Sequence, residues 1–475
     1  MSVPSTASFE MTIGGKPAAS NQTIDVINPA TGENFNSAPE CSPEQLDEAM
    51  LAAERAFTEW RKSPERRREV LRACAEAING HAEQLSNLLT LEQGKPLASS
   101  RIEIRGSAKW FDYTSKLECP VEIALDNDRV RIEVHRKPCG VVAAITPWNY
   151  PVSLAVWKIA PALLAGNTMV LKPSPFTPLS TLLLGEILRN VVPAGVLNIV
   201  SGGDALGAKM TVHPLVRKIS FTGSVSAGKL VARAAADDLK RVTLELGGND
   251  PAIILPDVEP AAIAKRIFWG AFENAGQVCS AIKRVYVPTE KYEDFLQQIS
   301  SIAKKVQVGN GLDESTKMGP INNKPQFERV TELVEDARDH GARIVTGGNP
   351  VGQAGYLYQP TVVGDISDGT RLVDEEQFGP VLPIVPYENV EDVITCANKT
   401  HFGLGGSVWS NDTDLAVELA GRLECGTTWI NQHLNILPHA PFGGAKWSGI
   451  GVENGPWGLL GFTEIQTVNI AKPTS

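Results

Sequence analysis

The run Val141-Val142-Ala143-Ala144-Ile145 is apolar throughout, and it begins a regular alternation of strand-like and helix-like stretches. Four further apolar runs continue the pattern, with helical stretches between them: Thr168–Leu171, Val196–Val200, Lys218–Phe221 and Val242–Leu246. Strands that alternate with helices predict a parallel sheet covered by helices on both faces. The predicted fold class is therefore α/β, with a Rossmann-like, doubly wound sheet that binds its ligands at the carboxyl ends of the strands.

Polar and small residues follow these predicted strands. Such residues stand at or just after a strand end at five places: Asn149, Lys172, Gly202, Gly223 and Glu245. Because the carboxyl ends of parallel strands meet at one edge of a sheet, we expect these residues to gather around a common ligand.

Residues from about 250 to 440 repeat the alternation of strands and helices. Their apolar runs are Ala252–Leu255, Arg284–Val287, Val381–Val385 and Thr427–Ile430. A second α/β domain is expected here, with Cys279 on its face towards the first domain. We expect the first domain to comprise residues 1–119 and 139–247, and the second to comprise residues 248–447.

Two short alternating runs, Val121–Leu125 and Val130–Val134, flank the polar turn Asp126-Asn127-Asp128 and predict a β-hairpin. An isolated hairpin is rarely stable, so this one should pair with something else, such as another subunit. Residues 463–472 also have the pattern of a strand with an exposed edge, and free edges invite pairing. We expect a small β oligomerisation element made of residues 120–138 and 448–475.

The composition is that of a globular protein, and it excludes two classes of partner. Of the 475 residues, 43% are hydrophobic and 21% are charged, and a chain of this length can form two or more domains. The formal net charge of -10 argues against nucleic acid. The most apolar stretch, 141–171, contains two asparagines, a lysine and three prolines, so a buried strand-helix-strand unit is expected there and a membrane span is not.

The seven cysteines are odd in number and widely spaced, and no CxxC motif occurs. Neither a disulfide framework nor a metal cluster is expected. The N-terminus, from Met1 to Lys16, is polar and lacks the pattern of a secretory signal. We expect a reducing, cytoplasmic location.

One cysteine stands in an unusual setting, Asn274-Ala275-Gly276-Gln277-Val278-Cys279, some thirty residues after Glu245-Leu246-Gly247-Gly248-Asn249. Small neighbours let backbone and ligand approach closely, so this thiol and carboxylate suggest a nucleophile and a base. Taken alone, a free cysteine is more often a buried structural residue, and the other six are interpreted in that way.

The stretch Phe221-Thr222-Gly223-Ser224 ends a predicted strand and opens a helix. Gly223 would permit a tight turn there, and the helix N-terminus would suit a phosphate. The longer run up to Gly228-Lys229 fits most of a P-loop, but Leu230 stands where that motif needs Ser or Thr. Spacing alone leaves a structural turn and a nucleotide site equally open.

Seven motifs occur in an order that spans nearly the whole chain: Thr146-Pro147-Trp148-Asn149-Tyr150-Pro151; Gly166-Asn167-Thr168 with Leu171-Lys172-Pro173-Ser174; Phe221-Thr222-Gly223-Ser224; Leu244-Glu245-Leu246-Gly247-Gly248; Gly276-Gln277-Val278-Cys279; Glu375-Glu376-Gln377-Phe378-Gly379-Pro380; and Pro441-Phe442-Gly443-Gly444 with Ser448-Gly449-Ile450-Gly451. In this order they resemble the NAD(P)-dependent aldehyde dehydrogenase superfamily. The resemblance implies that the first domain binds NAD(P) and the second carries the catalytic cysteine.

By this resemblance Cys279 is the nucleophile, which forms a thiohemiacetal and then a thioester with the substrate. Glu245 matches the base that activates water. The side chain of Asn149 and the backbone N–H of Cys279 match the donors to the oxyanion. Lys158 and Glu453 match a proton-relay pair behind the base. Each of these residues, taken singly, could also be a turn residue or a solvated charge.

The resemblance also implies a cofactor, NAD or NADP, and the residues around it. Lys172 matches the lysine at the adenosine ribose, and Glu376 matches the acid at the nicotinamide ribose. The remaining cofactor residues by this match are Trp148, Ser174, Pro175, Gly223, Ser224 and Phe378.

Pro175 departs from the pattern of many NAD-preferring members, which carry a glutamate at that position. Such a glutamate would bind the ribose hydroxyls and repel a 2′-phosphate, so its absence removes an element that excludes NADP. We expect both cofactors to be accepted.

The substrate tunnel should be lined by Tyr150, Trp157, Val278, Ser280, Ile436 and Phe442. This set is mainly apolar and holds no arginine or lysine to bind a carboxylate, so an uncharged aliphatic or aromatic aldehyde is expected. His433 and His439 lie near the predicted entrance and are given no catalytic role. The resemblance and the preference for closed symmetry imply a homodimer or homotetramer.

Three other functions are alternatives to aldehyde oxidation. Leu230 counts against a P-loop nucleotide hydrolase. Intact Cys279, Glu245 and Asn149 count against a binding protein that has lost catalysis. Glu245 also counts against transfer of the acyl group to coenzyme A, because a water-activating base favours hydrolysis.

Overall fold

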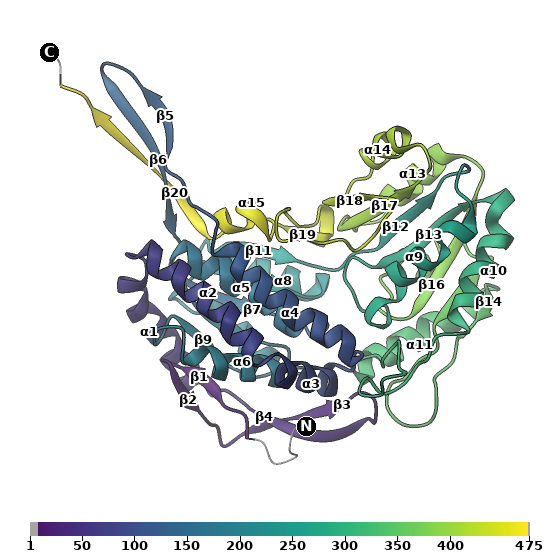
Figure 1. Cartoon of the computed structure of the whole chain (residues 1–475), viewed down its shortest axis with the longest axis horizontal. Coiled ribbons are helices and arrows are strands. Elements are labelled where there is room, and N and C mark those ends of the chain that lie inside the picture. Colours follow the sequence, from purple (N-terminus) through teal and green to yellow (C-terminus); the bar gives the residue numbers. More distant parts are fainter. Residues whose placement is uncertain (1–7, 474–475) are drawn as a thin grey trace.

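The computed structural model describes residues 8–473, so the outermost residues of the predicted domains, 1–7 and 474–475, lie outside the described range. Within that range the strands form an 8-stranded sheet, a 7-stranded sheet, a 3-stranded sheet and a 2-stranded sheet. The two large sheets lie side by side, and the three-stranded sheet projects away from them as an arm (Figure 1). The predicted α/β fold class is confirmed.

The eight-stranded sheet has the order β19-β11-β10-β7-β8-β9-β1-β2. Its five central strands are parallel and match the predicted apolar runs: β7 (Val141–Ile145), β8 (Thr168–Lys172), β9 (Leu197–Ile199), β10 (Val216–Thr222) and β11 (Arg241–Glu245). Three antiparallel strands complete it: β1 (Met11–Ile13), β2 (Lys16–Ala18) and β19 (Gly449–Ile450). Strand β7 is buried along its whole length, because parallel sheets carry helices on both faces.

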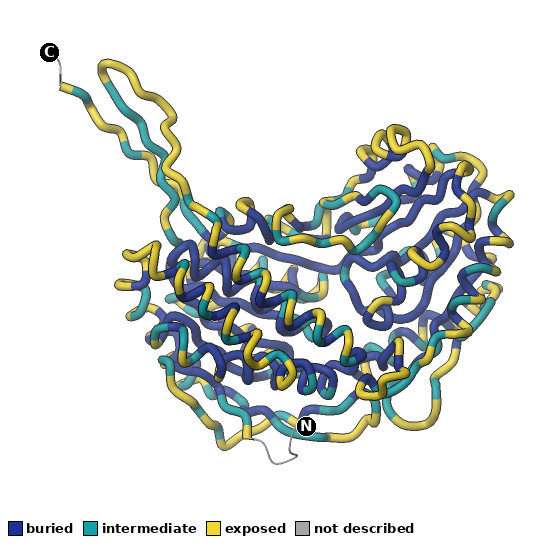
Figure 2. The backbone as a smooth tube through the Cα atoms, in the orientation of Figure 1, coloured by how far each residue is buried: buried dark blue, intermediate teal, exposed yellow. Residues whose placement is uncertain are grey.

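Eight helices accompany this sheet in the described residues. They are α1 (Pro43–Trp60), α2 (Pro64–Gly80), α3 (Ala82–Gln93), α4 (Leu97–Thr114), α5 (Pro151–Ala165), α6 (Leu179–Arg189), α7 (Asp204–Val212) and α8 (Val225–Ala236). Helix α5 is buried at nearly every position, because it lies between the sheet and the outer helices α2 and α4 (Figures 1 and 2).

The seven-stranded sheet has the order β14-β15-β16-β13-β12-β17-β18 and is parallel except for β14. Its strands are β12 (Asp250–Ile254), β13 (Ile282–Pro288), β14 (Arg343–Thr346), β15 (Thr361–Gly364), β16 (Val381–Tyr387), β17 (Gly405–Trp409) and β18 (Thr427–Ile430). Its helices are α9 (Pro260–Phe272), α10 (Tyr292–Ala303), α11 (Lys324–Asp339), α12 (Arg371–Asp374), α13 (Val390–Asn398) and α14 (Thr413–Ala420). Three short 3₁₀ helices are η1 (Glu273–Gly276), η2 (Thr289–Lys291) and η3 (Lys446–Ser448).

The predicted hairpin forms as β5 (Glu122–Asp126) and β6 (Val130–Pro138), and β20 (Thr463–Ala471) pairs antiparallel with β6 along its whole length. The partner that the hairpin needs is therefore the C-terminal strand of the same chain. Every residue of β5 is exposed, and Figure 2 shows the arm as exposed or half-buried.

Residues 448–462 differ from the prediction, which put them in the oligomerisation element with β20. Strand β19 instead pairs with β11 in the eight-stranded sheet, and α15 (Gly455–Leu460) packs on α5. A Cβ at Gly449 would lie 2.2 Å from the carbonyl oxygen of Leu244, so glycine allows this close approach. Leu459 and Phe462 are buried in the core of that sheet.

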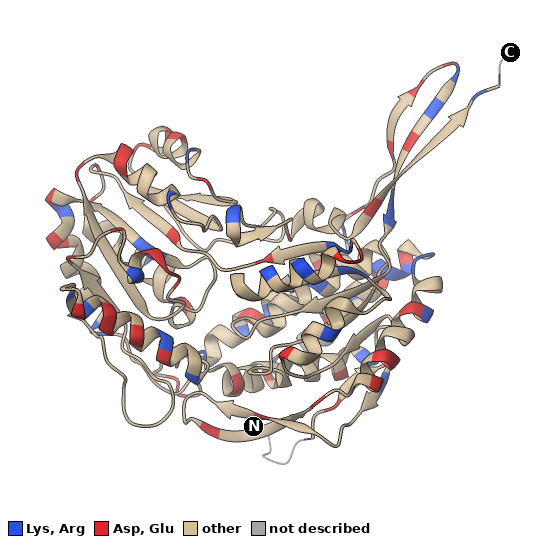
Figure 3. Cartoon of the chain, turned by 180° about the vertical axis from the view of Figure 1, so that it is seen from behind, with Lys and Arg blue, Asp and Glu red and all other residues tan. Residues whose placement is uncertain are grey.

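Residues predicted in the first domain also form a separate hairpin, β3 (Thr23–Asn28) with β4 (Glu33–Pro39). Acidic and basic residues are interspersed along the outer helices (Figure 3). No helix within residues 8–473 is both long and apolar enough to span a membrane.

Candidate active site

A cavity of about 260 Å³ brings together strand ends of the eight-stranded sheet, helices α4 and α5, and the loops around residues 278–280 and 434–442. The predicted site residues that line it are Asn149, Tyr150, Trp157, Glu245, Val278, Cys279, Ser280, Ile436, Phe442 and Glu453. Four of the five predicted catalytic residues and all six predicted substrate residues thus share one cavity. The fifth, Lys158, is bonded to Glu453 at its wall.

The segment before Cys279 has a strained backbone. Asn274 and Ala275 have φ values of 50° and 56°, a left-handed conformation that costs free energy in residues other than glycine. The buried Gln277 holds this turn, because its Nε2 donates to Asn274 O at 2.7 Å and its Oε1 accepts from Asn322 N at 2.8 Å. Cys279 is only half-buried, although its neighbours on both sides are buried.

Burial raises the pKa of the Cys279 thiol to about 12, and the charges of Glu376, Glu245 and Asp250 act in the same direction. Lys283 opposes them. With only the protein's own groups around it, the thiol is protonated at neutral pH. A base or an additional positive charge is therefore needed to form the reactive thiolate.

Asn149 is buried and held at its backbone. Its carbonyl oxygen accepts from Lys95 Nζ at 2.8 Å and from Asn274 Nδ2 at 3.1 Å. Its side-chain Nδ2 donates to Gln277 O at 3.0 Å. A carboxamide has two N–H donors, so one remains for a ligand in the cavity.

Glu245 ends strand β11, and its carboxyl group lies in the cavity wall. Both of its oxygens are buried and have no hydrogen-bond partner among the described residues. Burial raises the pKa of Glu245 well above its usual range, Glu453 adds to the rise, and Lys158 opposes it. A carboxyl group with free oxygens beside a cavity can take a proton from a bound water or thiol.

Lys158 and Glu453 meet behind Glu245 although they are far apart in sequence. Lys158 Nζ lies 2.5 Å from Glu453 Oε1 and donates to Thr222 Oγ1 at 2.7 Å. Both side chains are almost completely buried. The other oxygen of Glu453 has no partner in the described residues, so this carboxylate retains a free acceptor.

Of the predicted cofactor residues, Glu376 and Ser224 line a second cavity of about 650 Å³. Glu376 Oε1 accepts from Gly248 N at 3.2 Å, and a Cβ at Gly247 would lie 2.0 Å from its Oε2. Burial raises the pKa of Glu376 to about 7, against the opposing effect of Lys283.

Three further contacts involve predicted cofactor residues. Trp148 and Phe378 pack edge to face with ring centroids 5.2 Å apart. Lys172 is buried with Nζ donating to Pro173 O at 3.0 Å, and burial lowers its pKa to about 8. Ser224 caps α8, because its Oγ accepts from Ala227 N.

These groups fit a dinucleotide. A carboxylate can accept from ribose hydroxyls, a buried lysine can donate to them, and a helix N-terminus suits a pyrophosphate. Gly247 leaves the backbone open to close approach.

Gly223 does not have the positive φ that a tight turn would use. Its small size matters instead, because a Cβ there would lie 2.6 Å from the ring of Phe221. Gly228, in the P-loop-like run, packs against Leu246 in the same way.

Pro175 lies apart from the 650 Å³ cavity. It lines a cavity of about 230 Å³ with Phe176, Asn322, Lys324 and the β3–β4 hairpin. Ser174 Oγ accepts from Phe176 N at 3.3 Å and so fixes the loop that carries Pro175.

Two further residues lie near Cys279: Asp250, which the sequence did not single out, and His433, which was expected near the entrance with no catalytic role. His433 Nε2 donates to Ser280 O at 2.8 Å, and its Nδ1 accepts from Ser407 Oγ at 2.9 Å. Burial lowers the pKa of His433 to about 3, so its ring is neutral. A lone histidine in a loop gives no sequence signal for such a bridge.

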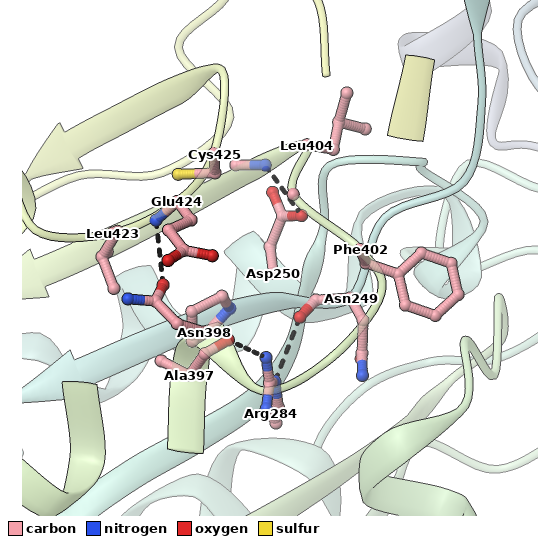
Figure 4. A pocket seen from close by; sticks show the side chains of 13 residues that line it. Asn249, Asp250, Arg284, Ala397, Asn398, Phe402, Leu404, Leu423, Glu424 and Cys425 are labelled. Carbon is pink, nitrogen blue, oxygen red and sulfur yellow. Dashed lines mark hydrogen bonds between the residues drawn. The ribbon is translucent and has the colours of Figure 1, made fainter. Parts of the chain in front are cut away.

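Asp250 lies at a small space of about 10 Å³ (Figure 4), which is room for one water molecule. Its Oδ1 accepts from Gly405 N at 3.1 Å, and burial raises its pKa to about 8.

The sequence analysis also missed three charged residues that the structure buries: Lys95, Glu103 and Lys283.

The raised pKa of Cys279 predicts how fast the thiol reacts with iodoacetamide. Because the thiolate fraction grows about tenfold per pH unit below the pKa, inactivation of the protein without cofactor should accelerate steadily from about pH 7 to about pH 10. Mass spectrometry of the labelled protein, with Cys279→Ala as the control, assigns the reaction to this residue. A plateau in the rate near neutral pH would contradict the raised pKa.

The model of the aldehyde dehydrogenase family matches residues 16–468. Phenylacetaldehyde dehydrogenase from Pseudomonas fluorescens is 38% identical over 482 residues, which cover 97% of this chain and 96% of the relative. The NAD+ complex of an aldehyde dehydrogenase from Bacillus cereus has a TM-score of 0.95 at 35% identity, and the match covers 98% of this chain and 97% of that one. An NADP dependent enzyme of E. coli has a TM-score of 0.94 at 36% identity, with 98% of each chain covered. The chain therefore belongs to the aldehyde dehydrogenase family and is an enzyme that oxidises aldehydes with NAD or NADP.

Proposed function

We propose that this enzyme oxidises an uncharged aliphatic or aromatic aldehyde to the carboxylic acid, with Cys279 as nucleophile and Glu245 as the base that activates water. The observation that carries the proposal is the single cavity lined by Cys279, Glu245 and Asn149. Acyl chemistry at an aldehyde carbon requires three groups in one cavity: a thiol, an unpartnered carboxyl group and an amide donor.

In the first step Glu245 takes the proton of the Cys279 thiol, and the sulfur forms a bond to the aldehyde carbon. The carbonyl oxygen becomes an oxyanion, which accepts hydrogen bonds from Asn149 Nδ2 and from the backbone N–H of Cys279. Lys172, Glu376 and the start of α8 would hold the nicotinamide cofactor, which when bound would supply the acceptor for the hydride of this carbon.

In the second step the acyl group on Cys279 is hydrolysed. Once Glu245 has lost the proton that it took from the thiol, it takes a proton from water as the water oxygen attacks the acyl carbon, and the carbon–sulfur bond breaks to release the acid and the thiolate. Glu453, with its free oxygen and its bond to Lys158, would pass the proton onward from Glu245. Hydrolysis is preferred over transfer to coenzyme A because the base lies in the cavity wall.

The cavity wall supports an uncharged substrate. Trp110 stacks on Trp157 with ring centroids 5.5 Å apart, and Trp157 packs edge-on against Phe442 at 6.0 Å. No lysine or arginine of the described chain lines the cavity, whereas Glu273 and Glu103 do. A carboxylate tail would meet no cation there, while apolar and aromatic bodies bury well. The relative named phenylacetaldehyde dehydrogenase agrees with an aromatic substrate.

The organisation of the whole enzyme is also proposed. Residues 1–119 and 139–247 would form the cofactor domain and residues 248–447 the catalytic domain. The exposed arm of β5, β6 and β20 would pair subunits into a homodimer or homotetramer. The seven cysteines are free thiols in the described chain, which is consistent with a cytoplasmic location.

The function is tested by replacing its base. Glu245→Gln keeps the packing but cannot take a proton, so deacylation should slow more than hydride transfer. We expect a burst of reduced cofactor followed by slow turnover, measured by stopped-flow absorbance with an aldehyde panel, with and without coenzyme A. Because the base acts deprotonated and its pKa is raised, wild-type turnover should rise with pH over a range above the usual titration range of a glutamate, and Glu245→Gln should lose this rise.

Two results would oppose the mechanism. Reduced cofactor formed by Cys279→Ala would exclude the thiol as nucleophile. Wild-type turnover by Glu245→Gln would remove Glu245 from the role of base.

Cofactor choice is tested at Pro175. We expect the wild type to use NADP with a kcat/KM not far below that for NAD. Pro175→Glu should reduce the NADP value by roughly ten- to hundredfold through repulsion of the 2′-phosphate and should change the NAD value much less. Pro175→Gln, which lacks the charge, controls for loss of the proline ring. Strict use of NAD by the wild type would show that another group sets the preference.

The proposed subunit contact is tested on the arm. Ile123 and Ile465 are exposed apolar residues of β5 and β20. The double substitution Ile123→Lys/Ile465→Lys should give monomers at micromolar concentration, because like charges oppose strand pairing. Light scattering measures the mass, and Val417→Lys on α14 is the exposed control. A wild type that is itself monomeric would exclude the proposal.

A further inference from the structure

We propose that the buried ion pair of Lys95 and Glu103 is a clamp that positions Asn149 for catalysis. This inference rests on the proposed function, because it takes Asn149 to be a donor to the oxyanion. Lys95 and Glu103 would act through Asn149 and are positioning residues.

The ion pair lies where water does not reach. Lys95 Nζ and Glu103 Oε2 are 2.6 Å apart, and both side chains are completely buried. Lys95 stands between α3 and α4, and Glu103 lies on α4 two turns later. Withdrawing two charges from water costs free energy that their attraction often fails to recover. Stability alone therefore does not explain why this ion pair is buried.

Each member of the pair holds the loop that carries Asn149. Lys95 Nζ donates to Asn149 O at 2.8 Å and lies 3.6 Å from the centroid of the Tyr150 ring. Glu103 Oε1 accepts from the backbone N–H groups of Val152 and Ser153, both at 3.1 Å. These two N–H groups belong to the first turn of α5, whose N-cap residue gives no side-chain cap. Glu103 supplies that cap from another helix.

The pair thus fixes the chain at two points, at Asn149 and at the start of α5. Asn149 is held at its carbonyl oxygen, and the helix that follows is held at its N-terminus. The direction of the Asn149 side chain then depends on one further bond, from Nδ2 to Gln277 O at 3.0 Å. Since a displacement of about 1 Å in a reacting group can cost about a hundredfold in rate, the clamp has a catalytic consequence.

Glu103 lines the active-site cavity but has no free oxygen for proton transfer. One oxygen is bonded to Lys95 and the other to α5. Its place in the wall is thus explained by the clamp and not by acid–base chemistry.

The decisive variant is Lys95→Met/Glu103→Gln. Methionine fills the space of the lysine stem without a donor, and glutamine retains an acceptor for the N–H groups of α5. Neutral groups of similar volume often replace a buried ion pair without loss of stability, so we expect a Tm close to that of the wild type. We expect kcat to fall about ten- to hundredfold with little change in KM, and the rate of Cys279 alkylation to stay unchanged.

The control variant is Arg101→Met on the same helix. Arg101 pairs with Glu83 on the surface and lies outside the clamp, so its removal should leave kcat unchanged. If the double variant does not fold, Lys95→Arg retains the charge beside Glu103 while it moves the donor away from Asn149 O. A fall in kcat with retained Tm supports the clamp, and wild-type kcat in either folded variant overturns it.

A double-mutant cycle between Asn149 and the ion pair separates positioning from structural support alone. Asn149→Ala should lower kcat by about a hundredfold or more, and adding Lys95→Met/Glu103→Gln to it should cost little further, because both changes remove one function. If the falls in kcat from the two changes multiply, the changes act independently, and the clamp is overturned. Unchanged activity of Asn149→Ala would instead refute the role of Asn149 itself, which is a failure of the proposed function.

Discussion

Charges withdrawn from water at the junction of the two large sheets constrain this molecule more than any other interaction. Glu245, Glu453 and Glu376 all lie there, and burying a carboxylate is costly unless a cation or an N–H donor lies nearby. Lys158 and Lys283 provide the cations. The fold therefore has to bring Lys158, from a helix beside the eight-stranded sheet, and Lys283, from a strand of the seven-stranded sheet, close to these acids.

Local sequence was enough to predict most of the first sheet. Five apolar runs coincide with β7 to β11, since strands buried on both faces need continuous apolar residues. Ten of the residues that the order of the motifs singled out line one cavity, and their roles belong to the proposed function. The bond between Lys158 and Glu453 could be expected only by resemblance, because the two residues stand 295 positions apart.

Other features depend on contacts that no local pattern records. The segment 448–462 was assigned to the arm, because a two-residue strand such as β19 has no detectable periodicity. The chain bends at Gly223 between β10 and α8, as expected, but the small size of glycine matters there because of the ring of Phe221 and not because of a positive φ. Lys95 and Glu103 look like ordinary surface charges in the sequence, and their burial follows only from the packing of α4 on α5.

The late position of β19 has a consequence for synthesis of the protein. Strand β11, which ends in Glu245, is made long before β19 covers its edge, and Glu453 follows β19 directly. Until then the growing chain has an open, hydrogen-bonding strand edge that could pair with other chains. Nascent enzyme should thus be most prone to aggregation in the interval between translation of the first sheet and translation of its last strand, when it also lacks one of its buried acids and cannot yet turn over substrate.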